Sequence, residues 1–350
     1  MSRDLRETEA LWKLVERTTR SGTASCHADL CINFAEWQWH QGVALYGLMK
    51  AGASLGDEAG RRFVREWVDA KLASGERPKS INTTAPVLAI AALHELSPKP
   101  EYREVCDEYA EWCMAKAPRL PDGTFEHSCT ANRYPLQVWA DTLFMGGIFL
   151  AKWGMKPGNR RYADEAARQF ANHYHYLHDD ATGLIVHGYD GATGSQKGVL
   201  WGRGNGWFTA ASIDVLGIFP AGSVERTLLE GNFRRHLDGV MATQDACGAW
   251  HTVMNDRSTY LEMSATAAFA MGLRWAGGQR WGEPRHRAAA DRAYAVLLSR
   301  ISPDGELLDA SGGTPVMPAA ADYNAVPFAV TCFSQGLAML ALSLPARSGK

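Results

Sequence analysis

The segment from Gln137 to Leu150 places one carboxylate in front of an apolar run. It reads QVWADTLFMGGIFL, and Asp141 is its only charged residue. A carboxylate is costly to bury unless it is paired, hydrogen-bonded or protonated. Asp141 therefore either complements a helix dipole near solvent or takes part in a reaction as an acid or a base.

Histidines recur in three of the connecting segments. Each follows a glycine-centred turn and a short extended piece, and they are His127, His187 and His251. Taken singly, such a histidine is more often a hydrogen-bonded structural residue than a catalyst. If the three connections share one rim, their side chains converge on the mouth that Asp141 faces.

Four tryptophans could pack in the core or stack on a sugar ring, namely Trp37, Trp39, Trp201 and Trp207. The tract HYHYLHDD (173–180) resembles a metal-binding segment, but it ends an amphipathic helix and only His175 and His178 share a face. We therefore expect no metal and no cofactor.

Two kinds of helical segment alternate along the chain. One kind is apolar nearly all round and should be buried: 39–52, 84–96, 139–154, 206–219, 264–277 and 327–344. The other kind is amphipathic and should lie outside: 5–20, 57–73, 101–117, 161–177, 224–241 and 283–300. This alternation predicts six helical hairpins that close into an all-α (α/α)6 toroid, with short hairpin-like loops on the active-site rim. We expect residues 1–350 to form one catalytic domain.

Composition excludes several classes of protein. The 350 residues carry a net charge of only −2, which favours neither a nucleic-acid nor a membrane partner. The charged N-terminus has no apolar signal core, and no apolar run reaches the roughly 20 residues of a membrane span. Seven scattered cysteines with no CxxC pair predict free thiols in a reducing compartment, so we expect a cytoplasmic protein.

Several segments in order resemble the unsaturated rhamnogalacturonyl hydrolases of glycoside hydrolase family 105. The most specific pair is WADTLFMGGIFLAKWG (139–154) and WGRGNGWFTAASIDVL (201–216), with His187 between them. WQWHQGVALYGL (37–48), SINTTAPVLAIAALHEL (80–96) and YLEMSATAAFAMGLRWA (260–276) extend the resemblance over nearly the whole chain.

The resemblance implies the same (α/α)6 fold and a substrate that ends in a 4,5-unsaturated uronic acid, left by a polysaccharide lyase. Unsaturated galacturonyl-rhamnose is the form that it favours. By the same match, Asp141 falls on the catalytic acid, and His187, Trp201 and Arg203 fall on substrate-contacting positions. We also expect contacts from Trp39, His40, Thr83, Arg133 and Trp207.

The implied chemistry is hydration of a vinyl ether. Protonated Asp141 would give its proton to carbon 4 and then, as a base, take a proton from the water that adds at carbon 5. One carboxylate serves both steps, unlike the two carboxylates of ordinary glycosidases. Asp141 must then have a raised pKa, which its apolar surroundings would supply.

One departure from related enzymes concerns the helix that begins near Ser80. Unsaturated glycuronyl hydrolases place a second aspartate there, whereas this chain has Asn82 and Thr83. These residues can hydrogen-bond but cannot take a proton, so the chemistry falls on Asp141.

An anionic substrate also needs a cation. Arg203 is the best candidate, since a guanidinium can bind a carboxylate with two hydrogen bonds, and Arg133 and Lys197 are alternatives.

Two other functions remain open at this stage. One is a sugar epimerase or isomerase on the same toroid, with His187 and His251 as acid and base. The other is a sugar-binding toroid without catalysis, in which Asp141 only hydrogen-bonds a hydroxyl. The sequence leaves open galacturonyl versus glucuronyl substrates, the following sugar, and whether the protein is a monomer or a homodimer.

Overall fold

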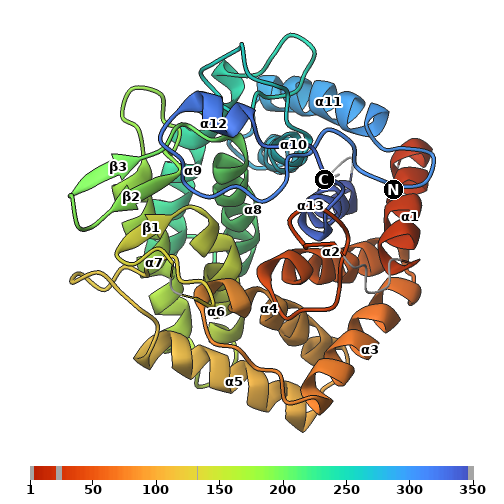
Figure 1. Ribbon diagram of the computed structural model, residues 1–350, viewed down its shortest axis with the longest axis vertical. Coiled ribbons are helices and arrows are strands. Elements are labelled where there is room, and N and C mark those ends of the chain that lie inside the picture. Colours follow the sequence, from red (N-terminus) through yellow and green to blue (C-terminus); the bar gives the residue numbers. More distant parts are fainter. Residues whose placement is uncertain (1–3, 21–25, 132, 346–350) are drawn as a thin grey trace.

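Twelve long helical segments form two concentric rings in a computed structural model of the protein, which describes residues 4–20, 26–131 and 133–345 (Figure 1). The inner ring consists of α2 (Trp39–Leu55), α4 (Ile81–Leu96), η1 with α6 (Leu143–Gly147 and Ile148–Gly154), α8 (Gly202–Ile218), α10 (Met263–Gly277) and α13 (Cys332–Ser343). The outer ring consists of α1 (Leu5–Arg20), α3 (Ala59–Ala73), α5 (Pro100–Ala115), α7 (Arg160–Leu177), α9 (Val224–Ala242) and α11 (Pro284–Ser299). The predicted (α/α)6 toroid is confirmed.

Small residues allow the inner ring to close. Helix α13 packs on α2 and joins the end of the ring to its beginning. A Cβ atom on Gly336 would lie 2.6 Å from the carbonyl oxygen of Val43, and one on Gly47 would lie 2.8 Å from that of Gly336. The backbones can approach this closely only because neither glycine has a side chain.

Four connections from an outer to an inner helix repeat one turn. Each contains a glycine with positive φ: Gly123 (88°), Gly183 (75°), Gly248 (102°) and Gly305 (82°). Short antiparallel bridges follow, including Arg119 with Phe125 and Ile301 with Leu307. The predicted pattern of a turn and a short extended piece is therefore confirmed.

A small antiparallel sheet lies on the rim, with the order β1 (Gln137–Trp139), β2 (Gly188–Asp190) and β3 (Ser195–Lys197). The prediction that an inner helix begins at Trp139 is wrong, because Trp139 pairs with Gly188 in the sheet. The helix starts at Asp141 and continues as the π-helical turn η1. The sequence pattern also missed the short helix α12 (Ala320–Asn324).

The prediction that all cysteines are free is wrong for one pair. Cys26 and Cys31 form a disulfide, because the turn between them brings their Cα atoms to 6.2 Å. The other cysteines are free, namely Cys106, Cys113, Cys129, Cys247 and Cys332. Within the described ranges, no helix combines the length and the apolar character needed to cross a membrane.

Candidate active site

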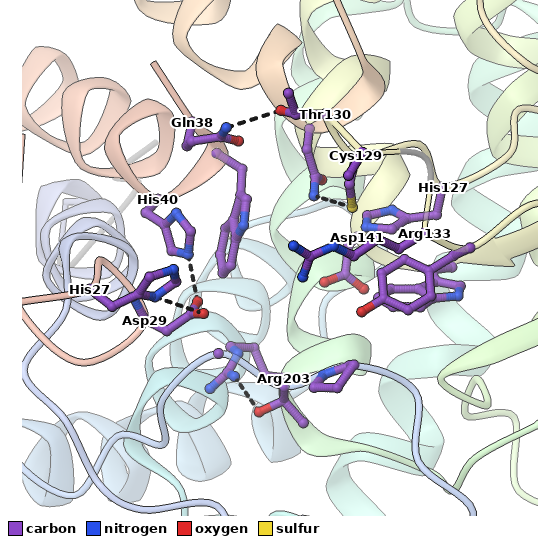
Figure 2. A pocket seen from close by; sticks show the side chains of 18 of the residues that line it. His27, Asp29, Gln38, His40, His127, Cys129, Thr130, Arg133, Asp141 and Arg203 are labelled. Atoms are coloured by element: carbon purple, nitrogen blue, oxygen red, sulfur yellow. Dashed lines mark hydrogen bonds and ion pairs between the residues drawn. The ribbon is translucent and has the colours of Figure 1, made fainter. Parts of the chain in front are cut away.

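A pocket of about 420 Å³ opens where the inner helices begin (Figure 2). Its walls include the first residues of α2 (Trp39 and His40), Asn82 of α4, Asp141 at the start of the η1 segment, and Trp201 and Arg203 at the start of α8. The predicted convergence of inner-helix N-termini on one mouth is confirmed for these four elements.

Asp141 is a buried carboxyl that faces this pocket. The residue is only 8% exposed, and among the described residues its Oδ2 atom has no hydrogen-bond partner. Burial raises the pKa of Asp141 to about 7, although the charge of Arg203 and the nearby Trp207 indole favour the ionised form. That indole does not reach good hydrogen-bond geometry, because its Nε1 also lacks a partner. The predicted direction of the pKa shift and its cause are confirmed.

The rim sheet brings His187 beside Asp141. Trp139 pairs with Gly188, so the residues just beyond these two strand ends become neighbours. The Nε2 atom of His187 lies 3.8 Å from Asp141 Oδ2, and it too has no partner among the described residues. Burial lowers the pKa of His187 well below its usual range, so the imidazole is neutral.

The other two loop histidines differ from each other. His127 lines the pocket, stacks on Trp139 at 4.3 Å and hydrogen-bonds Thr142 Oγ1 at 3.1 Å. His251 does not line the pocket, and its Nδ1 donates to the carbonyl of Thr259 at 2.5 Å. The expectation that all three histidines line the mouth is therefore wrong for His251, and also for His187, which is fully buried and does not line the pocket.

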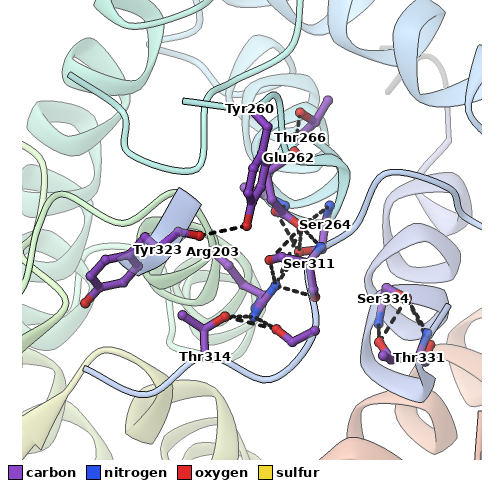
Figure 3. A network of polar contacts seen from close by, with 12 residues as sticks. Arg203, Tyr260, Glu262, Ser264, Thr266, Ser311, Thr314, Tyr323, Thr331 and Ser334 are labelled. Atoms are coloured by element: carbon purple, nitrogen blue, oxygen red, sulfur yellow. Dashed lines mark hydrogen bonds and ion pairs between the residues drawn. The ribbon is translucent and has the colours of Figure 1, made fainter. Parts of the chain in front are cut away.

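Arg203 is fully buried and holds a loop in place (Figure 3). Its Nη1 donates to Ser311 Oγ at 2.7 Å and to the Ser311 carbonyl at 3.0 Å. Its Nη2 donates to the carbonyl of Gly312 at 2.6 Å and to Thr314 Oγ1 at 2.8 Å. Both terminal nitrogens are thus engaged by the protein, whereas Arg203 lines the pocket and its Nε has no partner among the described residues, so its contact with a substrate stays a prediction.

Glu262 completes this network. Its carboxylate lies 3.6 Å from Arg203 Nη1, accepts the Ser311 amide at 2.9 Å and caps α10 by accepting the Ala265 amide at 2.7 Å. Both charged groups are buried and depend on one another, because removing one would leave the other unpaired in the interior.

Two expected substrate contacts are structural instead. Thr83 closes the capping box of α4, because its Oγ1 accepts the Ser80 amide at 2.8 Å while Ser80 Oγ accepts the Thr83 amide. Trp207 is fully buried and packs on Phe144 with ring centres 5.0 Å apart. Neither residue reaches the pocket wall, whereas Trp39, His40, Trp201 and Arg133 do.

The N-terminal loop supplies a polar wall of the pocket that no sequence pattern predicts. Asp29 accepts a hydrogen bond from His40 Nε2 at 2.6 Å and lies 3.2 Å from His27. Burial favours its neutral form, but the hydrogen bond from His40 outweighs burial, with the charge of Arg203 acting in the same direction, and the pKa of Asp29 is lowered. No spacing or periodicity marks Asp29, because it lies in an irregular loop. Glu36, Gln38, Cys129, Thr130 and Tyr134 line the pocket as well.

Asn82 and Arg133 present free polar groups to the same pocket. Asn82 donates to Cys129 Sγ at 3.2 Å, while its buried Oδ1 has no partner within the described ranges. Arg133 is exposed, lines the pocket and makes no ion pair with any described residue. Lys197, in contrast, pairs with Asp190 and does not reach the pocket.

Comparison with known proteins identifies the class. A family model described as Glycosyl Hydrolase Family 88 matches residues 13–347. The chain is 33% identical over 316 residues to the Bacillus subtilis (strain 168) protein named unsaturated rhamnogalacturonyl hydrolase YesR, covering 89% of this chain and 90% of that protein. The protein is therefore a glycoside hydrolase.

Solved structures agree with this assignment. One from Salmonella enterica serovar Paratyphi A, described as a possible member of the GH105 family, has a TM-score of 0.90 and 31% identity, covering 96% of this chain and 93% of that chain. The unsaturated glucuronyl hydrolase of Bacillus sp. GL1 has a TM-score of 0.75 and 16% identity, with 96% of each chain covered, and shares the fold. The chain belongs to glycosyl hydrolase family 88.

The pKa of Asp141 predicts how stability depends on pH. The pKa of this carboxyl is raised from the ordinary 3.8 to about 7. At a pH between these two values, Asp141 keeps its proton in the folded protein and releases it in the unfolded chain. Unfolding therefore becomes easier as pH rises through this window, by up to about 4 kcal/mol. Asp141→Asn removes this dependence, so its melting temperature should exceed that of the wild type by a margin that grows from pH 5 to pH 8.

The control for this prediction is Asp291→Asn, which changes an exposed carboxylate on α11. Its melting temperature should follow that of the wild type at every pH. A margin between Asp141→Asn and the wild type that is the same at pH 5 and pH 8 would contradict a raised pKa at Asp141.

Proposed function

We propose that the protein removes a 4,5-unsaturated uronic acid from the non-reducing end of a lyase-generated oligosaccharide by hydrating the C4=C5 double bond. The observation that carries this proposal is that one of the pocket carboxyls, Asp141, is buried, has an unpartnered oxygen and has a pKa of about 7. Such a group is protonated in a large fraction of molecules near neutral pH and can act first as an acid and then as a base.

In the proposed reaction Asp141 gives its proton to carbon 4, and the electrons of the double bond leave an oxocarbenium ion at carbon 5. Water then adds to carbon 5 and returns a proton to Asp141. The resulting hemiketal opens by cleavage of its ring C–O bond, and the aglycone leaves as an alcohol from the hemiacetal at carbon 1. The products are a 5-keto-4-deoxyuronate and a shortened oligosaccharide, and no cofactor takes part.

The name of the Bacillus subtilis relative supports a galacturonyl-rhamnose substrate for this chain. The carboxylate of that substrate lies on carbon 5 and needs a cation beside it. Both terminal nitrogens of Arg203 donate hydrogen bonds to the 311–314 loop. Arg133, in contrast, lines the pocket and makes no ion pair with any described residue. We therefore assign the substrate carboxylate to Arg133.

The alternatives receive less support from the site. An epimerase with His187 and His251 as its acid and base needs both in the pocket, and neither of them lines it. Ordinary glycoside hydrolysis with Asp29 as the second carboxylate is the stronger rival, since Asp29 lines the pocket and the pKa of its carboxyl is lowered. A non-catalytic sugar-binding role would leave the raised pKa of Asp141 without a use.

The first test is substrate turnover, followed as loss of the ultraviolet absorbance of the conjugated double bond. Asp141→Asn keeps the shape of the side chain but cannot transfer a proton, so turnover should fall by roughly 10²–10⁴-fold. In the wild type, kcat/KM should decline above about pH 7, because Asp141 must start protonated. Asp291→Asn should match the wild type. Retention of more than about a tenth of the activity in Asp141→Asn would exclude it as the acid.

The second test concerns Arg133. Arg133→Gln should lower kcat/KM for the unsaturated uronate by about 10- to 100-fold, the size of one hydrogen bond to a charged group. The same change should have little effect on an analogue whose carboxylate is an amide. Arg62→Gln, an exposed change on outer helix α3, is the control and should leave kcat/KM unchanged for both the acid and the amide. Equal losses on the acid and the amide would show that Arg133 does not recognise the carboxylate.

A further inference from the structure

The hydrogen bonds around Tyr323 determine which nitrogen of His187 carries its proton. Tyr323, on α12, is fully buried, and its hydroxyl oxygen lies 2.7 Å from His187 Nδ1. The same oxygen accepts the amide hydrogen of Met317 at 3.2 Å. Among the described residues, Nδ1 is the only acceptor that the hydroxyl hydrogen reaches, because Met317 approaches it with a donor. The hydroxyl therefore donates to Nδ1.

A neutral imidazole has one N–H, and an Nδ1 that accepts a hydrogen bond leaves this hydrogen on Nε2. Nε2 lies 3.8 Å from Asp141 Oδ2, which is too far for a direct hydrogen bond. Among the described residues both atoms lack partners. The Nε2–H therefore faces the carboxyl oxygen of Asp141 across 3.8 Å, and both atoms are buried.

We propose that Tyr323 is a positioning residue of this site: its hydroxyl fixes the tautomer of His187 that presents Nε2–H to the carboxyl of Asp141. There the N–H stabilises the carboxylate that Asp141 becomes when it gives up its proton. This kinetic role rests on the proposed function, whereas the assignment of the tautomer rests on the hydrogen bonds alone.

Neighbouring residues hold the side chains of Tyr323 and His187 in position. The hydroxyl of Tyr260 donates to the carbonyl of Tyr323 at 3.0 Å and anchors α12 (Figure 3). Trp201 packs on the His187 ring with centres 4.1 Å apart. Gly198 has a φ of 83°, and a Cβ there would lie 2.6 Å from the Tyr323 hydroxyl. Only glycine leaves room for the hydroxyl at this point.

The tautomer can be measured directly in the full-length protein labelled with ¹⁵N-histidine. Long-range ¹H–¹⁵N correlation spectra distinguish an imidazole protonated at Nε2 from one protonated at Nδ1, and His187→Gln identifies the signals. We expect the proton on Nε2 in the wild type and a substantial Nδ1–H population in Tyr323→Phe. A wild-type proton on Nδ1, or an unchanged tautomer in Tyr323→Phe, would overturn the proposal. The wild-type spectrum decides even if the variant does not fold.

The kinetic test uses the same variant. Tyr323→Phe should lower kcat/KM on the unsaturated uronide by roughly 10- to 100-fold, as for the loss of one oriented hydrogen bond at the reacting groups. Tyr109→Phe is the matched control, because this buried hydroxyl donates to the carbonyl of Pro78 away from the pocket. An unaltered kcat/KM in Tyr323→Phe would overturn the role in catalysis. If the wild type consumes no unsaturated uronide, the proposed function fails while the spectra still decide the tautomer.

Discussion

The free energy needed to keep the Asp141 carboxyl out of water is the constraint on which the rest of the site depends. Its pKa of about 7 arises from burial, and burial at this point requires the inner helices to close tightly around it. Glycine contacts such as Gly47 with Gly336 permit that closure. The strand pair that precedes the helix then sets His187 beside the carboxyl without supplying a hydrogen bond that would lower the pKa.

A buried ion pair also fixes the geometry of the site. Arg203 and Glu262 tie the starts of α8 and α10 to the 311–314 loop. Removal of either partner would leave an unpaired charge in the interior, so this pair fixes geometry more than it adds stability. The positive charge of Arg203 also draws Asp141 toward ionisation, but burial outweighs it. The site therefore combines a fixed cation with a carboxyl that can change its protonation state.

Periodicity in the sequence was sufficient to predict both rings, because every inner helix is apolar all round and every outer helix has a polar face. Asp141 could be singled out for the same reason, as a lone carboxylate in an apolar run. The protein partners of Arg203 and Thr83 could not be predicted, because a residue type does not reveal which groups it will bind. Arg203 donates to the Gly312 carbonyl, and Thr83 accepts the Ser80 amide. Asp29 lies in an irregular loop, and Tyr323 lies in a helix of only five residues. Neither segment is long enough to show a hydrophobic periodicity that would single out these residues.

The central claim is that water adds to carbon 5 of an unsaturated uronide while Asp141 moves the protons. A single turnover in ¹⁸O-labelled water, stopped before the ketone at carbon 5 and the aldehyde at carbon 1 exchange, tests it most directly, with ¹³C NMR of the released uronate to locate the heavy oxygen. Hydration predicts the label on carbon 5 and none on carbon 1. A label on carbon 1 would mean ordinary cleavage at the anomeric carbon, with Asp29 as the candidate second carboxylate, and would contradict the account.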